Sequence, residues 1–453
     1  MQAMDSNRQG VDWRGGTHWV FFLLIAGAFF IIEHDTKAPE VFNLLMTAES
    51  LEEFGNIEQM YQPRAWRQVG TLFLGAMGLF LIIQKRRSGS GRLDMLGALM
   101  IFFLLWSGLS MAWSDDPALS FRRYVMFALL CVGAAGIAGR LTLPDILRMA
   151  VFIPGVYLAV GVALEAATGY FRPFASGYRF TGTVHPNIQA VNCALMFFGA
   201  LALWRSASEN RRRWLFPAAL AFVFIVLTRS RTALASSIFV LLFQWGLMQP
   251  YGKKAAVTSF LAAAAMLVLI AGDVILPAVG ERLQMGRTDR GEFRTLTGRT
   301  ALWRQCSEFL RERPVLGYGY GAFWNEERST EIIEEQGWPI SHAHNAYFDT
   351  ALESGPLAAL AYLLILLIGI YRAMARFRLT GNPAYLFFGA LLLFCAVNGM
   401  LESVAIQRTM LTFFTVIMLA RLTFYTEPRA QASVQENGAM LSRKALNPSG
   451  RMA

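Results

Sequence analysis

Two histidines stand beside an asparagine at the start of a long apolar segment, in the stretch Ser341-His-Ala-His-Asn345. Histidine ordinarily titrates near pH ~6.5, so a neutral imidazole can accept a proton in neutral solution. The apolar run from Ala358 to Ile370, with its flanks, is long enough to cross a bilayer. We therefore expect His342 and His344 to lie where the membrane meets water, and Asn345 to lie beside them.

Arginines are the second group of residues with suitable chemistry. Arg229 and Arg231 occupy a short turn between two apolar blocks, where a charge is costly unless it faces a cavity or a partner. Arg299 belongs to a long segment, 278–345, that holds nine arginines and no lysine. Guanidinium groups bind phosphate in a bidentate way, so these residues predict an anionic ligand. Two alternatives stay open. The chain has 36 arginines against five lysines, which is consistent with a compositional bias, and Arg229 or Arg231 could reach lipid headgroups.

A polar turn precedes another apolar block and reads Thr181-Gly-Thr-Val-His-Pro-Asn187. We expect His185 and Asn187 to line the same pocket as the arginines. A lone histidine such as His185 is, however, more often a structural hydrogen-bonding residue.

Glycines alternate with aromatic residues from Gly317 to Trp324. The rings of Tyr318, Tyr320 and Trp324 suit either a sugar or the lipid headgroup layer. The sequence favours membrane anchoring, with glycan binding as the alternative.

Five acids lie inside or near apolar blocks, where charges rarely occur by accident: Glu165, Asp273, Asp349, Glu353 and Glu402. Asp349 and Glu353 are one helical turn apart beside His344, and could tune its basicity or simply end a helix. The His342-x-His344 pair lacks a well-spaced third ligand, so we predict no metal site.

The elements that must position these residues are membrane helices. Hydrophobic residues make up 55% of the chain and charged residues only 16%, a balance that is rare in soluble domains. Twelve apolar blocks approach membrane-spanning length: 18–32, 67–84, 93–113, 120–139, 150–168, 188–205, 214–228, 232–248, 255–277, 346–371, 384–400 and 409–425. The sequence therefore predicts an all-α polytopic membrane protein with about 12 transmembrane helices.

Basic residues set the expected orientation, because basic short loops stay in the cytoplasm. The clusters Lys85–Arg87, Arg211–Arg213, Lys253-Lys254 and Arg372–Arg378 fall on one side if every block crosses, which places both termini in the cytoplasm. The first block lacks a cleavage pattern, so we expect it to be retained. The domains would then be helices 1–9 over 1–277, a large external loop over 278–345, helices 10–12 over 346–425, and a disordered cytoplasmic tail over 426–453.

The external loop is predicted to contain an amphipathic helix that starts near Thr297, with Thr297 or Thr300 as the N-cap. Leu302, Cys306 and the pair Phe309-Leu310 would share one face. We expect that face to rest on the membrane surface.

Five short motifs carry a resemblance to a known family: Thr181–Asn187, Ser230-Arg-Thr-Ala233, Thr297–Trp303, Arg313–Gly319, and His344-Asn345 followed by Leu352–Gly355. In this order the chain resembles the O-antigen ligase and O-antigen polymerase superfamily, over roughly 170 to 400. The strings around Arg299 and Tyr318 look closest to polymerases of succinoglycan-type exopolysaccharides.

The resemblance implies a GT-C-like glycosyltransferase in the bacterial inner membrane, active at its periplasmic face. It would use oligosaccharides linked to undecaprenyl diphosphate and an acceptor glycan, without a metal or other cofactor and without nucleic acid. A flippase and a chain-length regulator are candidate partners. By motif position, Arg231 and Arg299 would bind the diphosphate and His344 would be the general base of an inverting transfer. Arg229 and His342 lie beside the best-defined motif positions.

Three other functions stay open at this point. A ligase would transfer the polysaccharide to lipid A-core instead of to another repeat unit. A secondary transporter would use the embedded acids to carry protons, although its polar residues would be expected at the midplane. An inactive scaffold in an export complex would not need His344.

Overall fold

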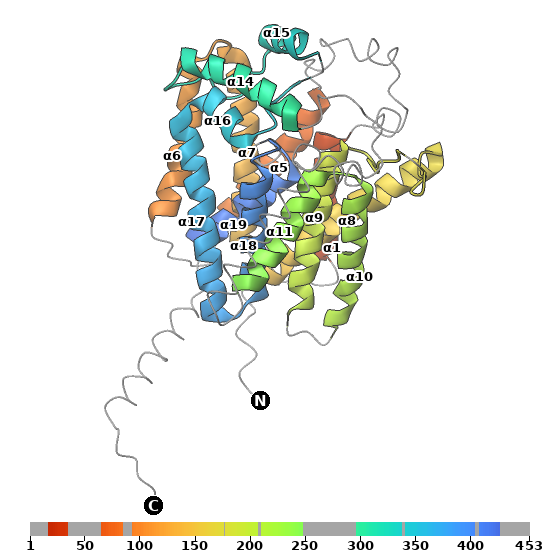
Figure 1. Ribbon diagram of the computed structural model, residues 1–453. Coiled ribbons are helices and arrows are strands. Elements are labelled where there is room, and N and C mark those ends of the chain that lie inside the picture. The colour runs from red at the N-terminus through yellow and green to blue at the C-terminus, as the bar shows by residue number, and fades with distance from the viewer. Residues whose placement is uncertain are drawn as a thin grey trace, which may run out of the picture.

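The apolar blocks of the sequence fold as helices that stand side by side in a bundle (Figure 1). The computed structural model describes residues 17–34, 65–84, 93–175, 177–206, 210–247, 296–337, 340–403 and 407–425. The bundle helices are α1 (Thr17–Glu33), α5 (Ala65–Ile83), α6 (Met95–Leu109), α7 (Pro117–Arg140), α8 (Leu143–Thr168), α9 (Pro186–Trp204), α10 (Leu215–Leu227), α11 (Arg231–Leu247), α17 (Pro356–Thr380), α18 (Pro383–Asn398) and α19 (Met410–Thr423).

Eleven of the twelve predicted blocks coincide with helices, and the ninth, 255–277, lies outside the described residues. Six described helices are long and apolar enough to cross a membrane: α5, α6 with the 3₁₀ turn Ser110–Trp113, α7, α8, α9 and α17. Three shorter apolar helices, α1, α18 and α19, lie among them. The chain is therefore a multi-pass, all-α membrane protein, as the sequence predicted.

The predicted block 346–371 is wrong as a single helix, because it divides into α16 (Ala346–Ser354) and α17. Gly355 separates them with a φ of 84°, in the left-handed region that favours glycine. A Cβ at this position would lie 2.0 Å from the Val315 carbonyl oxygen. Pro356 then begins α17, where a missing N–H costs nothing. The break leaves the histidine loop ahead of a short helix and outside the span.

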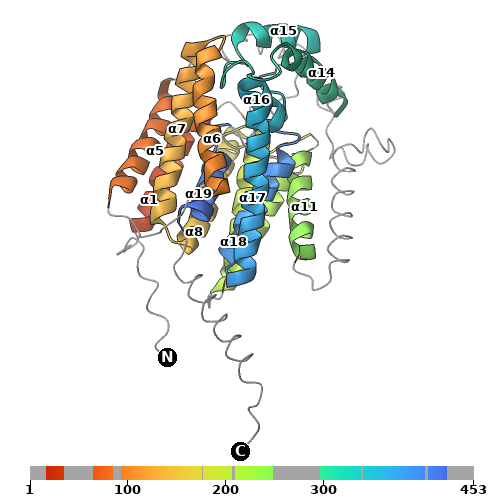
Figure 2. The same cartoon turned by 90° about the vertical axis from the view of Figure 1, so that its left-hand side faces the viewer.

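Two further helices, α14 (Leu296–Glu312) and α15 (Glu326–Gln336), lie across one end of the bundle (Figures 1 and 2). We call residues 296–337 the cap. The cap has a hydrophobic core of its own, to which α14, the 313–325 turn, α15, the loop 340–345 and α16 contribute: Leu302, Cys306, Tyr318, Phe323, Trp324, Ile332, Ile340, Ala343 and Leu352.

The structure differs from two expectations about α14. The apolar face of α14 packs inside this core, with Leu302 and Cys306 at 0% exposure, so it does not rest on the membrane surface. Helix α14 also begins at Leu296, ahead of both predicted capping threonines, Thr297 and Thr300. An ion pair of Arg299 with the bundle, described below, holds this first turn in place, and such tertiary contacts override local capping preference.

The helices α5, α7 and α19 run in the same direction. Gly75 meets Leu129 and Gly78 meets Gly133, so positions advance together along α5 and α7. A Cβ on Gly78 would lie 2.3 Å from the Gly133 Cα, which shows how closely small residues let these helices approach. At their far ends, Arg140 Nε donates to the Leu81 carbonyl at 3.0 Å. Helix α19 packs against α7, and Arg421 Nη1 donates to the Ala138 carbonyl at 3.2 Å.

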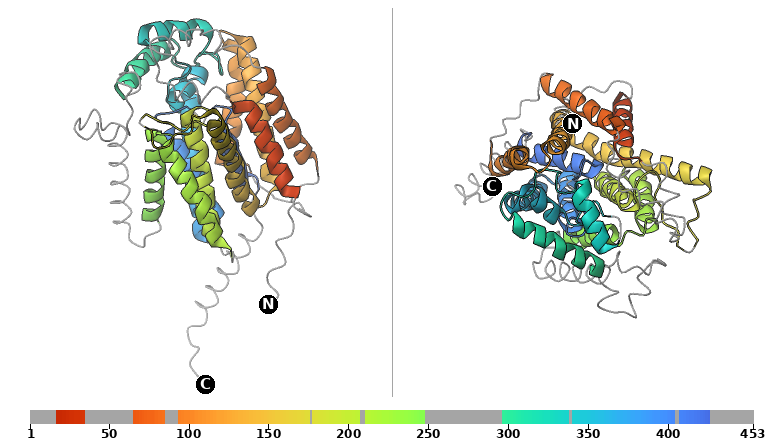
Figure 3. Two further views of the ribbon diagram at one scale, coloured as in Figure 1. Left: turned by 90° about the vertical axis from the view of Figure 1, so that its right-hand side faces the viewer. Right: turned by 90° about the horizontal axis from the view of Figure 1, so that it is seen from above.

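The end of the bundle away from the cap is basic. Arg372 Nη1 lies 2.6 Å from Asp94 Oδ2, and Arg376 Nη2 donates to the Leu422 carbonyl at 2.8 Å, near the end of α19. Helix α1 begins and α19 ends at this same end (Figure 3). The predicted cytoplasmic arginines of α17 thus lie opposite the cap, while the sidedness in the cell stays a prediction.

Candidate functional site

One buried carboxylate gathers polar residues from three distant parts of the chain. Glu402 follows α18 and is 3% exposed. Its Oε1 accepts hydrogen bonds from Arg299 Nη2 at 3.0 Å and from Asn187 Nδ2 at 2.9 Å. Its Oε2 lies 3.4 Å from His344 Nδ1. The predicted residues Arg299, Asn187 and His344 therefore converge, and Glu402 is the residue that brings them together.

The charge state of Glu402 follows from these neighbours. Burial raises the pKa of a carboxyl group, but here the Arg299 guanidinium and His344 hold the pKa of Glu402 well below its usual range. Glu402 is therefore ionised at neutral pH. Arg299 contacts Glu402 through Nη2, and a guanidinium carries five N–H donors. The pair leaves capacity at Arg299 for an anionic ligand.

The two histidines of the loop lie against each other. The ring centroids of His342 and His344 are 4.2 Å apart, and Ser341 Oγ lies 3.1 Å from His342 Nδ1. Burial lowers the pKa of His342, and the neighbouring His344 lowers it further, with smaller contributions from His185 and Arg299. His342 is therefore neutral at pH 7. Because the charge of His185 acts on His342, His185 lies close to the loop.

A buried aspartate fixes the histidine loop. Asp349, 2% exposed on α16, accepts hydrogen bonds from Trp324 Nε1 at 2.7 Å and from the Ala343 N–H at 2.9 Å, and a further one from the Ser403 hydroxyl. It thereby joins the cap, the histidine loop and the turn that carries Glu402. Of the two roles considered for Asp349, the contacts agree with a structural one.

Asn345 is also used to hold the loop. Its Oδ1 caps α16 by accepting from the Tyr347 and Phe348 N–H groups at 3.0 and 3.1 Å. Its Nδ2 donates to the Met400 carbonyl at 3.1 Å. Both ends of the amide are engaged, so Asn345 ties the loop to the turn that carries Glu402.

Two site residues have backbones in the left-handed region. Among the described residues other than glycine, only Arg229 (φ 51°) and His344 (φ 50°) adopt a positive φ. This conformation is uncommon for non-glycine residues and often occurs at functional sites. Both residues were selected from the sequence for their chemistry.

The turn 178–187 is built around Glu165, which is fully buried near the end of α8. Its two oxygens accept from the Tyr178 hydroxyl at 2.6 Å, the Thr181 N–H at 2.9 Å and the Gly182 N–H at 2.8 Å, with the Thr181 hydroxyl at 3.1 Å. A close backbone approach demands glycine here, since a Cβ on Gly182 would lie 3.0 Å from the Gly161 Cα. Glu165 thus holds the turn that carries His185 and Asn187 in place.

Arg179 connects this turn to the arginine turn. Its Nε donates to the Thr228 carbonyl at 3.1 Å, and its Nη2 lies 3.5 Å from Asn187 Oδ1. The Phe180 N–H donates to the Leu227 carbonyl at 2.9 Å. The turn with Arg229 is thereby held beside Asn187, and Arg231 begins α11 at its end. His185 caps α9, accepting from the Asn187 N–H at 3.1 Å.

Two residues of this site were not assigned a role from the sequence. Glu402 was noted only as one of five acids inside or near apolar blocks, and Arg179, which lies just ahead of the turn 181–187, was not singled out. The available signal was an acid a few residues beyond an apolar block, which normally reaches water. Its burial depends on three segments that the sequence does not place together.

The predicted aromatic contacts lie elsewhere. Tyr318 and Trp324, at 3% and 4% exposure, are members of the cap core. The ring of Tyr320 packs on Tyr124 and Phe127 of α7, with centroids 5.9 and 5.5 Å apart. These three rings are covered by protein, and the structure does not bring them to Glu402.

The cluster has one feature of a metal site. His342, His344 and Glu402 offer ligand atoms within 4.8 Å of one another, so Glu402 supplies the third ligand that the sequence lacked. However, its Oε1 already accepts from Arg299 and Asn187. A guanidinium in contact with the carboxylate opposes a divalent cation, so the donor set fits an anion better.

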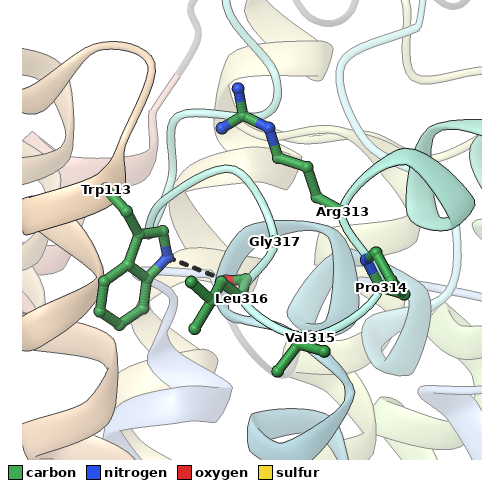
Figure 4. A pocket seen from close by; sticks show the side chains of 6 residues that line it. All are labelled: Trp113, Arg313, Pro314, Val315, Leu316 and Gly317. Carbon is green, nitrogen blue, oxygen red and sulfur yellow. Dashed lines mark hydrogen bonds between the residues drawn. The ribbon is translucent and has the colours of Figure 1, made fainter.

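A pocket of about 350 Å³ lies at the cap edge, lined by Trp113 and by residues 313–317 (Figure 4). Trp113 Nε1 donates to the Leu316 carbonyl at 3.0 Å (Figure 4). Arg313 pairs with Asp115 at 2.6 Å. None of the predicted site residues lines this pocket.

Comparison with known proteins shows what the chain is similar to. Residues 216–363 match the family model described as O-antigen ligase, a range that contains Arg231, Arg299 and His344 but ends before Glu402. The chain is also 25% identical to the exopolysaccharide production protein ExoQ of Rhizobium meliloti (strain 1021), over 75% of this chain and 78% of that protein. The predicted resemblance to the O-antigen ligase family is confirmed.

Proposed function

We propose that the protein is a glycosyltransferase that polymerises lipid-linked oligosaccharide repeat units into an exopolysaccharide. The observation that carries this proposal is the convergence of Arg299, His344 and Asn187 on Glu402. The similarity to ExoQ favours polymerisation over ligation, because that protein is an exopolysaccharide production protein.

The donor is a glycan attached to undecaprenyl diphosphate, which must leave with its negative charge. Arginines fixed in a partly dehydrated site stabilise such charge in the transition state more than in the ground state. Arg299, 15% exposed in its side chain, and Arg231 at the start of α11 are assigned to the diphosphate, with Arg229 beside them.

The acceptor hydroxyl must lose its proton as it attacks the anomeric carbon. With Glu402 facing His344 Nδ1, a proton on that nitrogen places the basic lone pair of the imidazole on Nε2, the atom that would act as the general base. A carboxylate that holds a histidine in one tautomer and orientation is the arrangement used by nucleophile–histidine–acid sites. Glu402 is therefore a positioning residue for His344.

The proposed transfer forms one bond at the anomeric carbon and breaks another. The acceptor oxygen forms a bond to the anomeric carbon while its proton passes to His344, and the bond from that carbon to the diphosphate breaks. Attack opposite the leaving group inverts the anomeric configuration. The diphosphate leaves against the arginines, and no metal ion takes part.

The cellular arrangement belongs to the same proposal. The predicted block 255–277, which lies outside the described residues, would complete about 12 spans of a GT-C-like fold, with both termini in the cytoplasm and the cap in the periplasm. Lipid-linked glycan would reach the site from the inner membrane, and a flippase and a chain-length regulator would act before and beside it.

Complementation of a deletion strain tests the proposal. Arg231→Ala, Arg299→Ala and His344→Ala should each abolish high-molecular-weight polymer at normal membrane levels, while Arg304→Ala, an exposed arginine on the same helix as Arg299, should retain it. Normal polymer from all three site variants would refute the assignment.

The same strain separates the alternatives. Loss of exopolysaccharide with unchanged lipopolysaccharide supports the polymerase, whereas loss of O-antigen laddering with free polymer still made would identify a ligase. Transport by a midplane cavity would leave polymer synthesis dependent on the embedded acids instead of on His344.

A further inference from the structure

Four arginines lie at the starts of three parallel helices, at the cap end of the bundle. Arg67 is in the first turn of α5, Arg122 and Arg123 are in the second turn of α7, and Arg408 directly precedes the capping residue of α19. The shared direction of α5, α7 and α19 places these turns at one end of the bundle.

The register of α5 against α7 brings the arginines level. Gly75 meets Leu129 and Gly78 meets Gly133, an offset of 54 to 55 residues. The same offset places Arg67 beside Arg122. Helix starts also present N–H groups and the positive end of the helix dipole, which adds to the positive potential there.

The four guanidinium groups act on one another. Burial lowers the pKa of Arg408, and the charges of Arg123, Arg67 and Arg122 lower it further, so all four lie within electrostatic reach. Arg408 makes no hydrogen bond or ion pair with the part of the chain that the structure describes. Like charges held this closely are unfavourable unless an anion compensates them.

Two described acids lie within electrostatic reach of these arginines. Glu33 acts on Arg67, and its Oε1 accepts from the Met410 N–H at 2.7 Å. Glu353 acts on Arg123, and Arg123 Nη1 donates to the Trp324 carbonyl at 3.3 Å and to the Gly321 carbonyl. Arg122 is exposed at the surface, so the cluster is open to solvent there.

We infer that Arg67, Arg122, Arg123 and Arg408 form a second anion site, which binds the phosphate or diphosphate head of a membrane lipid. Arginines recognise such groups in a bidentate way, and the site lies at the ends of membrane helices, where lipid heads are found. The inference rests on the proposed function in one respect, since a polymerase needs a second lipid-linked glycan as its acceptor.

The two sites are close enough to serve one reaction. Glu402 and Arg408 are six residues apart in one connection, so their Cα atoms are separated by no more than about 20 Å. A lipid held at Arg408 would therefore keep the sugar that it carries within reach of His344.

Binding stoichiometry tests the inference. The full-length protein in phosphatidylcholine nanodiscs is titrated with geranylgeranyl diphosphate, and the bound copies are counted by native mass spectrometry. We expect two in the wild type and one in Arg67→Gln/Arg408→Gln, with binding at the second site weakened about tenfold to a hundredfold by each lost arginine contact. Arg231→Ala/Arg299→Ala should also bind one copy, which separates failure here from failure of the proposed function.

Two further measurements make the test specific. Arg122 is exposed, so Arg122→Gln should fold normally and weaken binding of the second copy alone, whereas Arg311→Gln on the exposed face of α14 should change nothing. Competition by phosphatidylglycerol identifies an anionic phospholipid as the occupant, and resistance to it identifies a diphosphate-linked substrate. Unchanged binding of both copies in Arg122→Gln and Arg67→Gln/Arg408→Gln would overturn the inference.

Discussion

Replacement of Glu402 by glutamine is the sharpest perturbation of the proposed site. The side chain keeps its shape but loses the charge that Arg299 meets at 3.0 Å and that His344 Nδ1 faces at 3.4 Å. Removing one partner of a buried ion pair typically costs about 3 to 5 kcal/mol. Arg299 retains some contact with water, so the lower end, about 3 kcal/mol, is expected for the stability of Glu402→Gln.

We expect Glu402→Gln to lower activity even where the variant remains folded. An amide no longer favours the tautomer with the proton on Nδ1 of His344. The corresponding exchange in a serine protease triad lowers turnover about 10⁴-fold. Because the contact with His344 is long at 3.4 Å, we expect a decrease between about 10² and 10⁴-fold.

The assay is polymer formation by purified protein in nanodiscs, with Tm measured on the same samples. Glu308→Gln, an exposed acid on α14, is the matched control and should behave as the wild type. A tenfold loss of rate corresponds to about 1.4 kcal/mol of transition-state stabilisation. If folded Glu402→Gln keeps its activity within about threefold of the wild type, the positioning role of Glu402 is refuted.

Three further predictions follow from the contacts. Glu165→Gln should lose only about 1 kcal/mol of folding stability, because an amide can still hydrogen-bond Tyr178 and the turn. Glu165→Leu should lose at least about 3 kcal/mol, because it leaves several buried donors unpaired. Equal Tm values for the two variants would contradict the structural role of Glu165. The pKa of His342 is lowered in the folded state, so the unfolded chain binds one more proton and the stability of the protein falls as the pH drops below about 6.5. His342→Asn should therefore reduce the fall in Tm between about pH 7.5 and 5.5. An unchanged slope of Tm against pH would contradict this prediction. Chelators should leave polymer formation intact, and loss of activity restored by a divalent metal would instead support ligation by His342, His344 and Glu402.

Hydropathy predicted most of the bundle, because a membrane-spanning helix must satisfy its backbone internally and be apolar over its length. The division at Gly355 was missed because Ala346–Ser354 continues into α17 without a change in composition. The helix ends where Gly355 adopts a left-handed φ and its backbone passes too close to the distant Val315 carbonyl for a Cβ, an approach that local sequence does not report.

The candidate site was predicted in part. His344, Arg299 and Asn187 were selected by residue type and position, and the structure brings them together. Glu402 was missed in this role because its burial requires the start of α9, the turn after α18 and the start of α14 to meet. The aromatic residues Tyr318 and Trp324 were interpreted as surface groups, since the sequence does not reveal that the cap has its own core.

The left-handed backbone at His344 has a practical consequence. Most side chains would strain the loop at this position, whereas asparagine tolerates a positive φ unusually well. His344→Asn should therefore preserve the loop and the surrounding arginines while removing the base. Such a variant would accumulate the loaded donor and acceptor side by side, and it is the form of the protein with which to capture both substrates for structure determination.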